Sequence, residues 1–205
     1  MNVIAFMGTK GGCGSTTSAH LACLGSAWKG IPSYLLHTDT REPAELSSKR
    51  PYRYIDARDA KVLARAYNKL IEAKGEHWAV IDSGGNRDDF DAKIKKFADL
   101  IICPTDLDPE SVKFSIKNAQ DFNQTTPARI LVRCPLKLGA ADQKIFDSIP
   151  KELLLGRVDV VKASKMLKAD DDPETGFKTP PTNVNNLARK VHGLIFDFLN
   201  KPIDL

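Results

Sequence analysis

Short apolar segments alternate with longer segments of mixed polarity along most of this chain. The apolar segments are rich in β-branched residues and leucine, whereas the longer ones repeat apolar residues at helical spacing. We expect strands at residues 3–7, 33–37, 78–82, 98–105, 129–133 and 153–158. We expect helices at residues 16–29, 56–74, 88–97, 109–122, 140–148, 160–168 and 183–199. This alternation predicts an α/β fold, a mostly parallel twisted sheet with helices on both faces.

Two of the expected helices have a continuous apolar face. In helix 56–74 that face consists of Val62, Leu63, Ala66, Tyr67 and Leu70. In the last helix it consists of Leu187, Val191, Leu194, Ile195 and Phe198, with Arg189, Lys190 and His192 on the polar side. Such thin basic coverage favours packing against a protein core over binding to a membrane surface.

Length and composition favour one compact domain over residues 1–205. The first residues do not form a charged and then apolar leader, and no apolar stretch approaches the ~20 residues that span a bilayer. The four cysteines lie far apart and do not form a CxxC or Cys/His cluster, so they predict reduced thiols and neither zinc nor disulfides. We therefore expect a cytoplasmic protein that has no membrane partner.

A glycine-rich segment follows the first expected strand. Residues 8–17 read Gly-Thr-Lys-Gly-Gly-Cys-Gly-Ser-Thr-Thr, the pattern of a phosphate-binding loop that opens a helix. In the general pattern a lysine follows the last glycine, but here Ser15 stands in that place and Thr16 comes next. Backbone N–H groups and the positive helix end still predict phosphate binding, without the usual point charge beside the terminal phosphates.

The same segment resembles the deviant Walker A motif of the ParA/MinD ATPases at every defined position except Ser15. The resemblance implies a P-loop NTPase-like three-layer sandwich that binds ATP or ADP with Mg²⁺. It implies that Lys10 is the signature lysine, which reaches the partner's phosphates across a nucleotide-bound homodimer. It assigns nucleotide binding to Gly11, Gly12, Cys13, Gly14, Ser15, Thr16 and Thr17.

Three later segments resemble the same family, in the same order. Asp39 follows the second strand and matches the residue that positions the attacking water, while His37, Thr40 and Arg41 depart from the family pattern. Asp82 ends strand 78–82 and matches the acid that, with Thr16, holds Mg²⁺. Residues 98–105 resemble the strand and exit loop that come next.

Ser15 leaves two interpretations open. In one, the protein is a slow ATPase in which Lys10, Thr16, Asp39 and Asp82 compensate for the missing lysine. In the other, it is a pseudo-enzyme. The lost contact would cost about 2–4 kcal/mol of transition-state stabilisation, which slows turnover without abolishing nucleotide binding.

Basic residues exceed acidic ones, which gives a formal net charge of +4. The resemblance implies nonspecific DNA binding through basic residues of the C-terminal region, for which the candidates are Lys162, Lys165, Lys168 and Arg189. Counterion release would make such binding strongly salt-dependent, and it would place the protein on the nucleoid. An ordinary solvated face explains the same residues equally well.

Three functions are compatible with these features. The first is a ParA-like nucleotide-switched dimer in plasmid or chromosome segregation or in conjugative DNA transfer, whose partner binds a centromere-like or transfer-origin site. The second is a catalytically inactive adaptor of the same fold. The third, a ligase similar to dethiobiotin synthetase, is disfavoured because that chemistry needs the lysine missing at Ser15.

Overall fold

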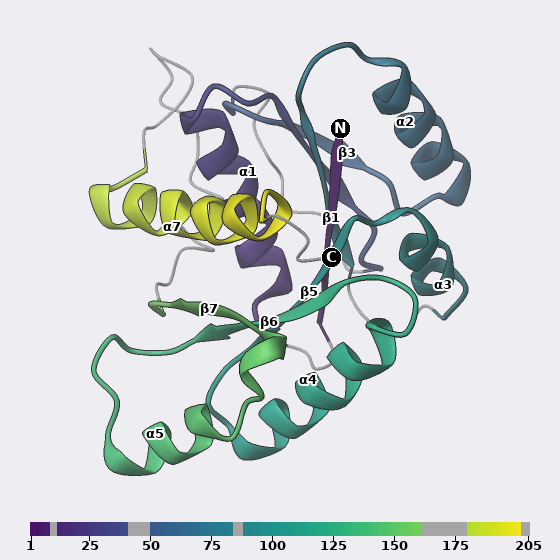
Figure 1. Cartoon of the computed structure of the whole chain (residues 1–205). Helices are drawn as coiled ribbons and strands as arrows, with labels where there is room; N and C mark the ends of the chain where they lie inside the picture. Colours follow the sequence, from purple (N-terminus) through teal and green to yellow (C-terminus); the bar gives the residue numbers. More distant parts are fainter. Residues whose placement is uncertain (9–11, 41–49, 84–87, 161–179, 202–205) are drawn as a thin grey trace.

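The computed structural model describes residues 1–8, 12–40, 50–83, 88–160 and 180–201. In this part of the chain one sheet of seven parallel strands has the order β3-β2-β4-β1-β5-β6-β7 (Figure 1). The strands are β1 (Asn2–Met7), β2 (Ser33–His37), β3 (Arg53–Asp56), β4 (Trp78–Ser83), β5 (Leu100–Thr105), β6 (Ala128–Arg133) and β7 (Leu154–Val158). The predicted parallel sheet is confirmed.

Helices cover both faces of the sheet and make a three-layer α/β fold. They are α1 (Ser15–Trp28), α2 (Ala60–Glu72), α3 (Asp88–Phe97), α4 (Pro109–Phe122), α5 (Ala140–Asp147) and α7 (Thr182–Leu199), with a short 3₁₀ turn η1 (Lys151–Leu153). One apolar core lies between the sheet and α1 with α7, and the other between the sheet and α2, α3, α4 and α5. The predicted three-layer arrangement is therefore confirmed (Figure 1).

The central strands are apolar on both sides because both of their faces are covered. Along β1, Ile4 and Phe6 face the core of α1 and α7, whereas Val3 and Ala5 face the other core. All four side chains are almost completely buried. Parallel strands of this kind end at one edge of the sheet, where loops collect the polar residues that follow them.

The region between β2 and α2 differs from the prediction. Strand β3 was not expected, and α2 begins at Ala60 rather than at residue 56. Asp59 fixes that start, because its side chain accepts a hydrogen bond from the Lys61 amide in an N-cap. Val62 is 37% exposed, so its assignment to the apolar face was wrong, while Leu63 and Leu70 are buried as expected.

Helix α7 packs against the core, as its apolar stripe predicted. Leu187, Val191 and Ile195 are buried, and Leu194 and Phe198 pack on the same core. His192 was placed on the polar face, and this was wrong: it is 3% exposed and its ring stacks on Trp78 with centroids 4.5 Å apart. Among the described residues no helix is long and apolar enough to cross a membrane. The helix expected at residues 160–168 lies outside the described residues from residue 161 on.

Candidate functional site

The glycine-rich segment forms a tight turn between β1 and α1. Gly12 and Gly14 have φ angles of 91° and 92°, which an L side chain rarely adopts. Gly14 is the N-cap of α1 and Ser15 is its first residue, so the free N–H groups and the positive dipole of the helix begin at this turn. Lys10 and Gly11 lie outside the described residues.

Three polar residues meet where α1 begins and β2 and β4 end. The hydroxyl of Thr16 donates to Asp82 Oδ1 at 3.2 Å. The other carboxylate oxygen of Asp82 lies 3.2 Å from His37 Nδ1. Asp82 is fully buried and His37 is 4% exposed. The structure therefore brings together Thr16 and Asp82, the two residues expected to hold Mg²⁺, and it adds a contact with His37 that was not predicted.

Contacts with the backbone of Asp82 fix the position of this residue. His37 and Asp82 are partners in the register of β2 and β4. The Thr38 amide and hydroxyl both donate to the carbonyl oxygen of Asp82, at 3.0 and 3.1 Å. Asp39 follows at the same edge and is 3% exposed. The two candidate carboxylates thus lie at the ends of neighbouring strands, as expected for a site at the carboxyl edge of a parallel sheet.

Ser15 is buried beside Gly8, at the end of β1. It is 6% exposed, and a Cβ built on Gly8 would lie 3.1 Å from its hydroxyl oxygen. Cys13 is also buried, and its Sγ atom would lie 2.5 Å from a Cβ on Gly8. Gly8 is therefore needed because two side chains approach its backbone closely, and neither side chain carries a positive charge.

The oxygen atoms at this edge suit a hard divalent cation. Mg²⁺ is bound in proteins by one or two carboxylates together with hydroxyl, water and phosphate oxygens. Thr16 and Asp82 offer a hydroxyl and a carboxylate that already face one another. These residues fit Mg²⁺, and the neighbouring helix end fits phosphate.

No family model matches the sequence, and no curated protein matches it. Solved structures do. The MinD cell division protein of Aquifex aeolicus superimposes with a TM-score of 0.68 at 15% identity, over 100% of this chain and 99% of that one. A putative plasmid partition protein of Borrelia burgdorferi bound to AMPPNP gives 0.65 at 16% identity, over 96% and 98%. MinD of Pyrococcus horikoshii complexed with Mg-ADP gives 0.66 at 11% identity, over 97% of both chains.

This chain has the MinD/ParA fold. The Borrelia burgdorferi protein holds AMPPNP and the Pyrococcus horikoshii protein holds Mg-ADP, so the fold accommodates nucleotide in those proteins. At these identities the likeness extends to the fold alone.

The side chain of Arg133 reaches the glycine-rich loop of this MinD/ParA fold from a distant part of the chain. Arg133 ends β6, and its Nη1 donates to the Cys13 carbonyl oxygen at 2.9 Å. Sequence reasoning missed this residue because 120 positions separate the two partners. Its place at the carboxyl end of a strand was the available signal.

The proposed DNA-binding residues are only partly described. Lys162, Lys165 and Lys168 lie outside the described residues. Arg189 is exposed on α7. Its exposure agrees with a surface role and does not distinguish DNA binding from a solvated face.

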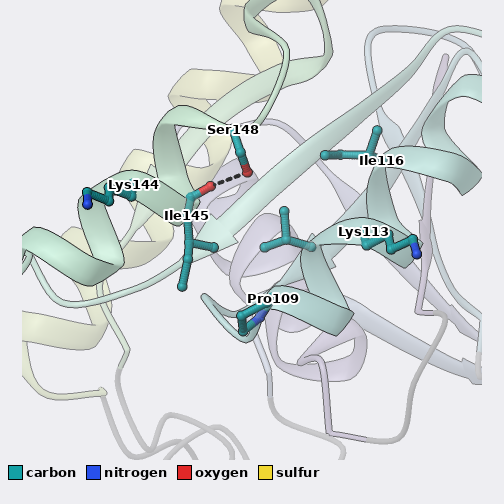
Figure 2. Close-up of a pocket in the computed structure, with 7 residues that line it drawn as sticks. Pro109, Lys113, Ile116, Lys144, Ile145 and Ser148 are labelled. Atoms are coloured by element: carbon teal, nitrogen blue, oxygen red, sulfur yellow. Dashed lines mark hydrogen bonds between the residues drawn. The ribbon is translucent and has the colours of Figure 1, made fainter.

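A separate groove of about 450 Å³ lies between α4 and α5 (Figure 2). Figure 2 shows Ile116 on α4 and Ile145 on α5 lining it, with Lys113 and Lys144 also in the lining. None of the glycine-loop residues belongs to this lining. The groove is therefore distinct from the phosphate-binding candidate.

Proposed function

We propose that this protein is a ParA-like nucleotide-switched dimer that acts in DNA segregation or in conjugative DNA transfer. The observation that carries the proposal is the hydrogen bond from Thr16 to Asp82 at the positive end of α1. It brings the loop hydroxyl to the strand-end carboxylate, beside backbone amides that can hold phosphate. The MinD/ParA fold also supports nucleotide binding at this site, because AMPPNP and Mg-ADP occur in proteins of that fold.

Each residue of the site would have its own role. The loop from Gly11 to Thr17 would hold the phosphates of ATP or ADP, and Thr16 with Asp82 would hold Mg²⁺, which neutralises phosphate charge when bound. Asp39 would orient the attacking water. Lys10 would reach the phosphates of the second protomer in the ATP-bound dimer. Hydrolysis would be weak because Ser15 cannot supply the usual positive charge.

The dimer would bind nonspecific DNA through the basic C-terminal region and a partner protein at a centromere-like or transfer-origin site. We propose a cytoplasmic, nucleoid-associated protein in which residues 1–205 form one domain. The roles of Lys162, Lys165, Lys168 and Arg189 belong to this proposal.

A second candidate is an inactive adaptor of the same fold. The specific observations in its favour are Ser15 and the contact of His37 with Asp82. A donor that occupies one carboxylate oxygen competes with magnesium and its bound water for that oxygen. In the adaptor, neither dimer formation nor DNA binding would respond to nucleotide.

Isothermal titration with ATP and Mg²⁺ separates the two candidates. We expect the parent protein to bind, and Ser15→Lys to bind more tightly and turn over faster because it restores a charge beside the phosphates. Ser148→Lys adds the same charge to an exposed position on the opposite side of the sheet and should leave affinity unchanged. Absence of binding heat in both the parent and Ser15→Lys would favour the adaptor.

A further inference from the structure

Arg133 makes two kinds of contact with the glycine-rich loop, a hydrogen bond and close packing. Besides its bond to the Cys13 carbonyl oxygen, its guanidinium fills the space beside the Gly14 Cα. A Cβ built on Gly14 would overlap Nη1 and Cζ and would lie 2.7 Å from Nε. Gly14 is therefore needed for two reasons, its left-handed backbone and the guanidinium packed on it.

Among the described residues, this guanidinium has no carboxylate within ion-pair distance. Arg133 is half-buried, and burial is the main cause that lowers its pKa below the ordinary arginine value. The group nevertheless remains protonated in proteins. Asp106 acts on it only at longer range, and in the described part of the chain no carboxylate forms an ion pair with it. A partly buried cation that has no ion pair is unfavourable unless an anion joins it.

The start of α1 adds further positive potential at the same place. Its N-cap, Gly14, offers no side-chain oxygen, and its first turn contains no acidic residue. At the edge of the sheet beside the loop, the Asp82 carboxylate is engaged by Thr16 and His37. A helix N-terminus and an unpaired guanidinium therefore converge on one loop, which is an arrangement that favours a phosphate group.

We propose that Arg133 supplies to the bound phosphate chain the positive charge that Ser15 lacks. This inference rests on the proposed nucleotide function and names the residue that makes it feasible. One N–H of the guanidinium bonds to Cys13, which leaves the others for phosphate oxygens. The charge thus comes from the end of β6 instead of from the first turn of α1.

Arg133 could instead have a structural role, in which it shapes the loop without touching phosphate. The Ser15→Lys substitution separates the two roles, because it can replace the charge of Arg133 but not its hydrogen bond. A lysine introduced by Ser15→Lys restores charge but does not restore the bond to Cys13. If Arg133 acts through charge, Arg133→Gln should be harmful in the parent and much less harmful in the Ser15→Lys background. If it acts through loop shape, the loss should be equal in both backgrounds.

The test is titration calorimetry with Mg-ATP and with inorganic tripolyphosphate. We expect Arg133→Gln to weaken binding of both probes about 10- to 100-fold. Arg133→Lys should retain part of the affinity. The matched control is Arg129→Gln, the same change at the other end of β6, where the side chain stacks on Phe198. It should leave both affinities unchanged.

Unchanged affinity in Arg133→Gln, or an equal loss in the Ser15→Lys background, would overturn the inference while the nucleotide function stands. If the parent binds no ATP, the proposed function fails. Binding of tripolyphosphate then decides whether Arg133 and the loop form an anion site. A rise in parent melting temperature with tripolyphosphate that Arg133→Gln abolishes would support the anion site. The absence of any rise would reject it.

Discussion

The free energy of the contact between Arg133 and Gly14 can be measured by comparing two glycines of the same loop. Gly12 and Gly14 have nearly the same φ, 91° and 92°. A Cβ on Gly12 would meet nothing within 4 Å, whereas a Cβ on Gly14 would collide with the guanidinium of Arg133. Comparing Gly12→Ala with Gly14→Ala therefore separates the backbone cost from the cost of displacing the arginine.

The backbone cost is common to both variants. A left-handed L residue costs roughly 1–2 kcal/mol, and alanine returns about 0.4–1 kcal/mol through the unfolded chain, so Gly12→Ala should destabilise by about 1 kcal/mol. Gly14→Ala must also break the hydrogen bond of Arg133, and a bond to a charged group contributes about 1.5–3 kcal/mol. We expect a total of about 2–4 kcal/mol for Gly14→Ala.

Urea unfolding at equilibrium measures these differences, provided that the slopes of the transitions agree. A double-mutant cycle with Arg133→Ala isolates the contact. In the Arg133→Ala background, Gly14→Ala should cost no more than Gly12→Ala. Equal costs of the two alanine substitutions in the parent would refute the packing of Arg133 on Gly14, and with it the basis for the anion site.

The remaining predictions concern the dimer, DNA and pH. ATP should promote dimerisation in sedimentation experiments, and Lys10→Ala should abolish this effect because the lysine would act across the dimer. DNA binding in mobility shifts should be independent of sequence, weaken steeply with salt, and fall when three C-terminal charges are reversed to Glu, at Lys162, Lys165 and Arg189. Burial lowers the pKa of His192, so this histidine favours the neutral form in the folded state. Its contribution to stability should be complete above about pH 6.5 and decline below it, as the unfolded chain takes up the proton, and His192→Leu should remove this part of the pH dependence of urea unfolding.

Each of these tests has a matched control. Lys29→Ala changes an exposed lysine just after α1 ends and should leave ATP-dependent dimerisation intact; a parent that stays monomeric with ATP would reject the role of Lys10. Three reversals on exposed positions of α2, at Lys61, Arg65 and Lys69, should leave DNA affinity largely unchanged. Equal losses from both sets would point to net charge instead of a surface. Parallel pH profiles of the parent and His192→Leu would contradict the buried, neutral histidine.

Local chemistry explains the parts of the fold that the sequence predicted. The glycine-rich turn that opens the first helix is a short-range signal, and in the structure Gly14 has the left-handed backbone that such a turn uses and is the N-cap of α1. Strand β3 gave no such signal. Its four residues, Arg53–Asp56, include no fully buried side chain and form the edge of the sheet, so their pairing with β2 and not their composition makes them a strand.

The parts of the site that were missed depend on contacts between distant segments. His37 meets Asp82 only because β2 and β4 are neighbours, which the order of the chain does not reveal. His192 has a helix position that faces solvent in a simple periodic pattern, yet Trp78 of β4 covers it. Arg133 reaches the loop in the same manner. Polar residues whose partners lie on other strands therefore cannot be assigned from periodicity alone.

Magnesium-dependent nucleotide binding is the most direct measurement of the central claim. At a ligand concentration about 100 times the dissociation constant, binding adds about 2.7 kcal/mol, which is about 5–10 °C in melting temperature for a chain of this size. We expect this rise with ATP and Mg²⁺, a smaller one with ATP and EDTA, and loss of the magnesium-dependent part in Asp82→Asn. Asp121→Asn, an exposed change near the end of α4, should behave as the parent does. The same rise with and without Mg²⁺, an undiminished magnesium effect in Asp82→Asn, or no rise at all would contradict the account.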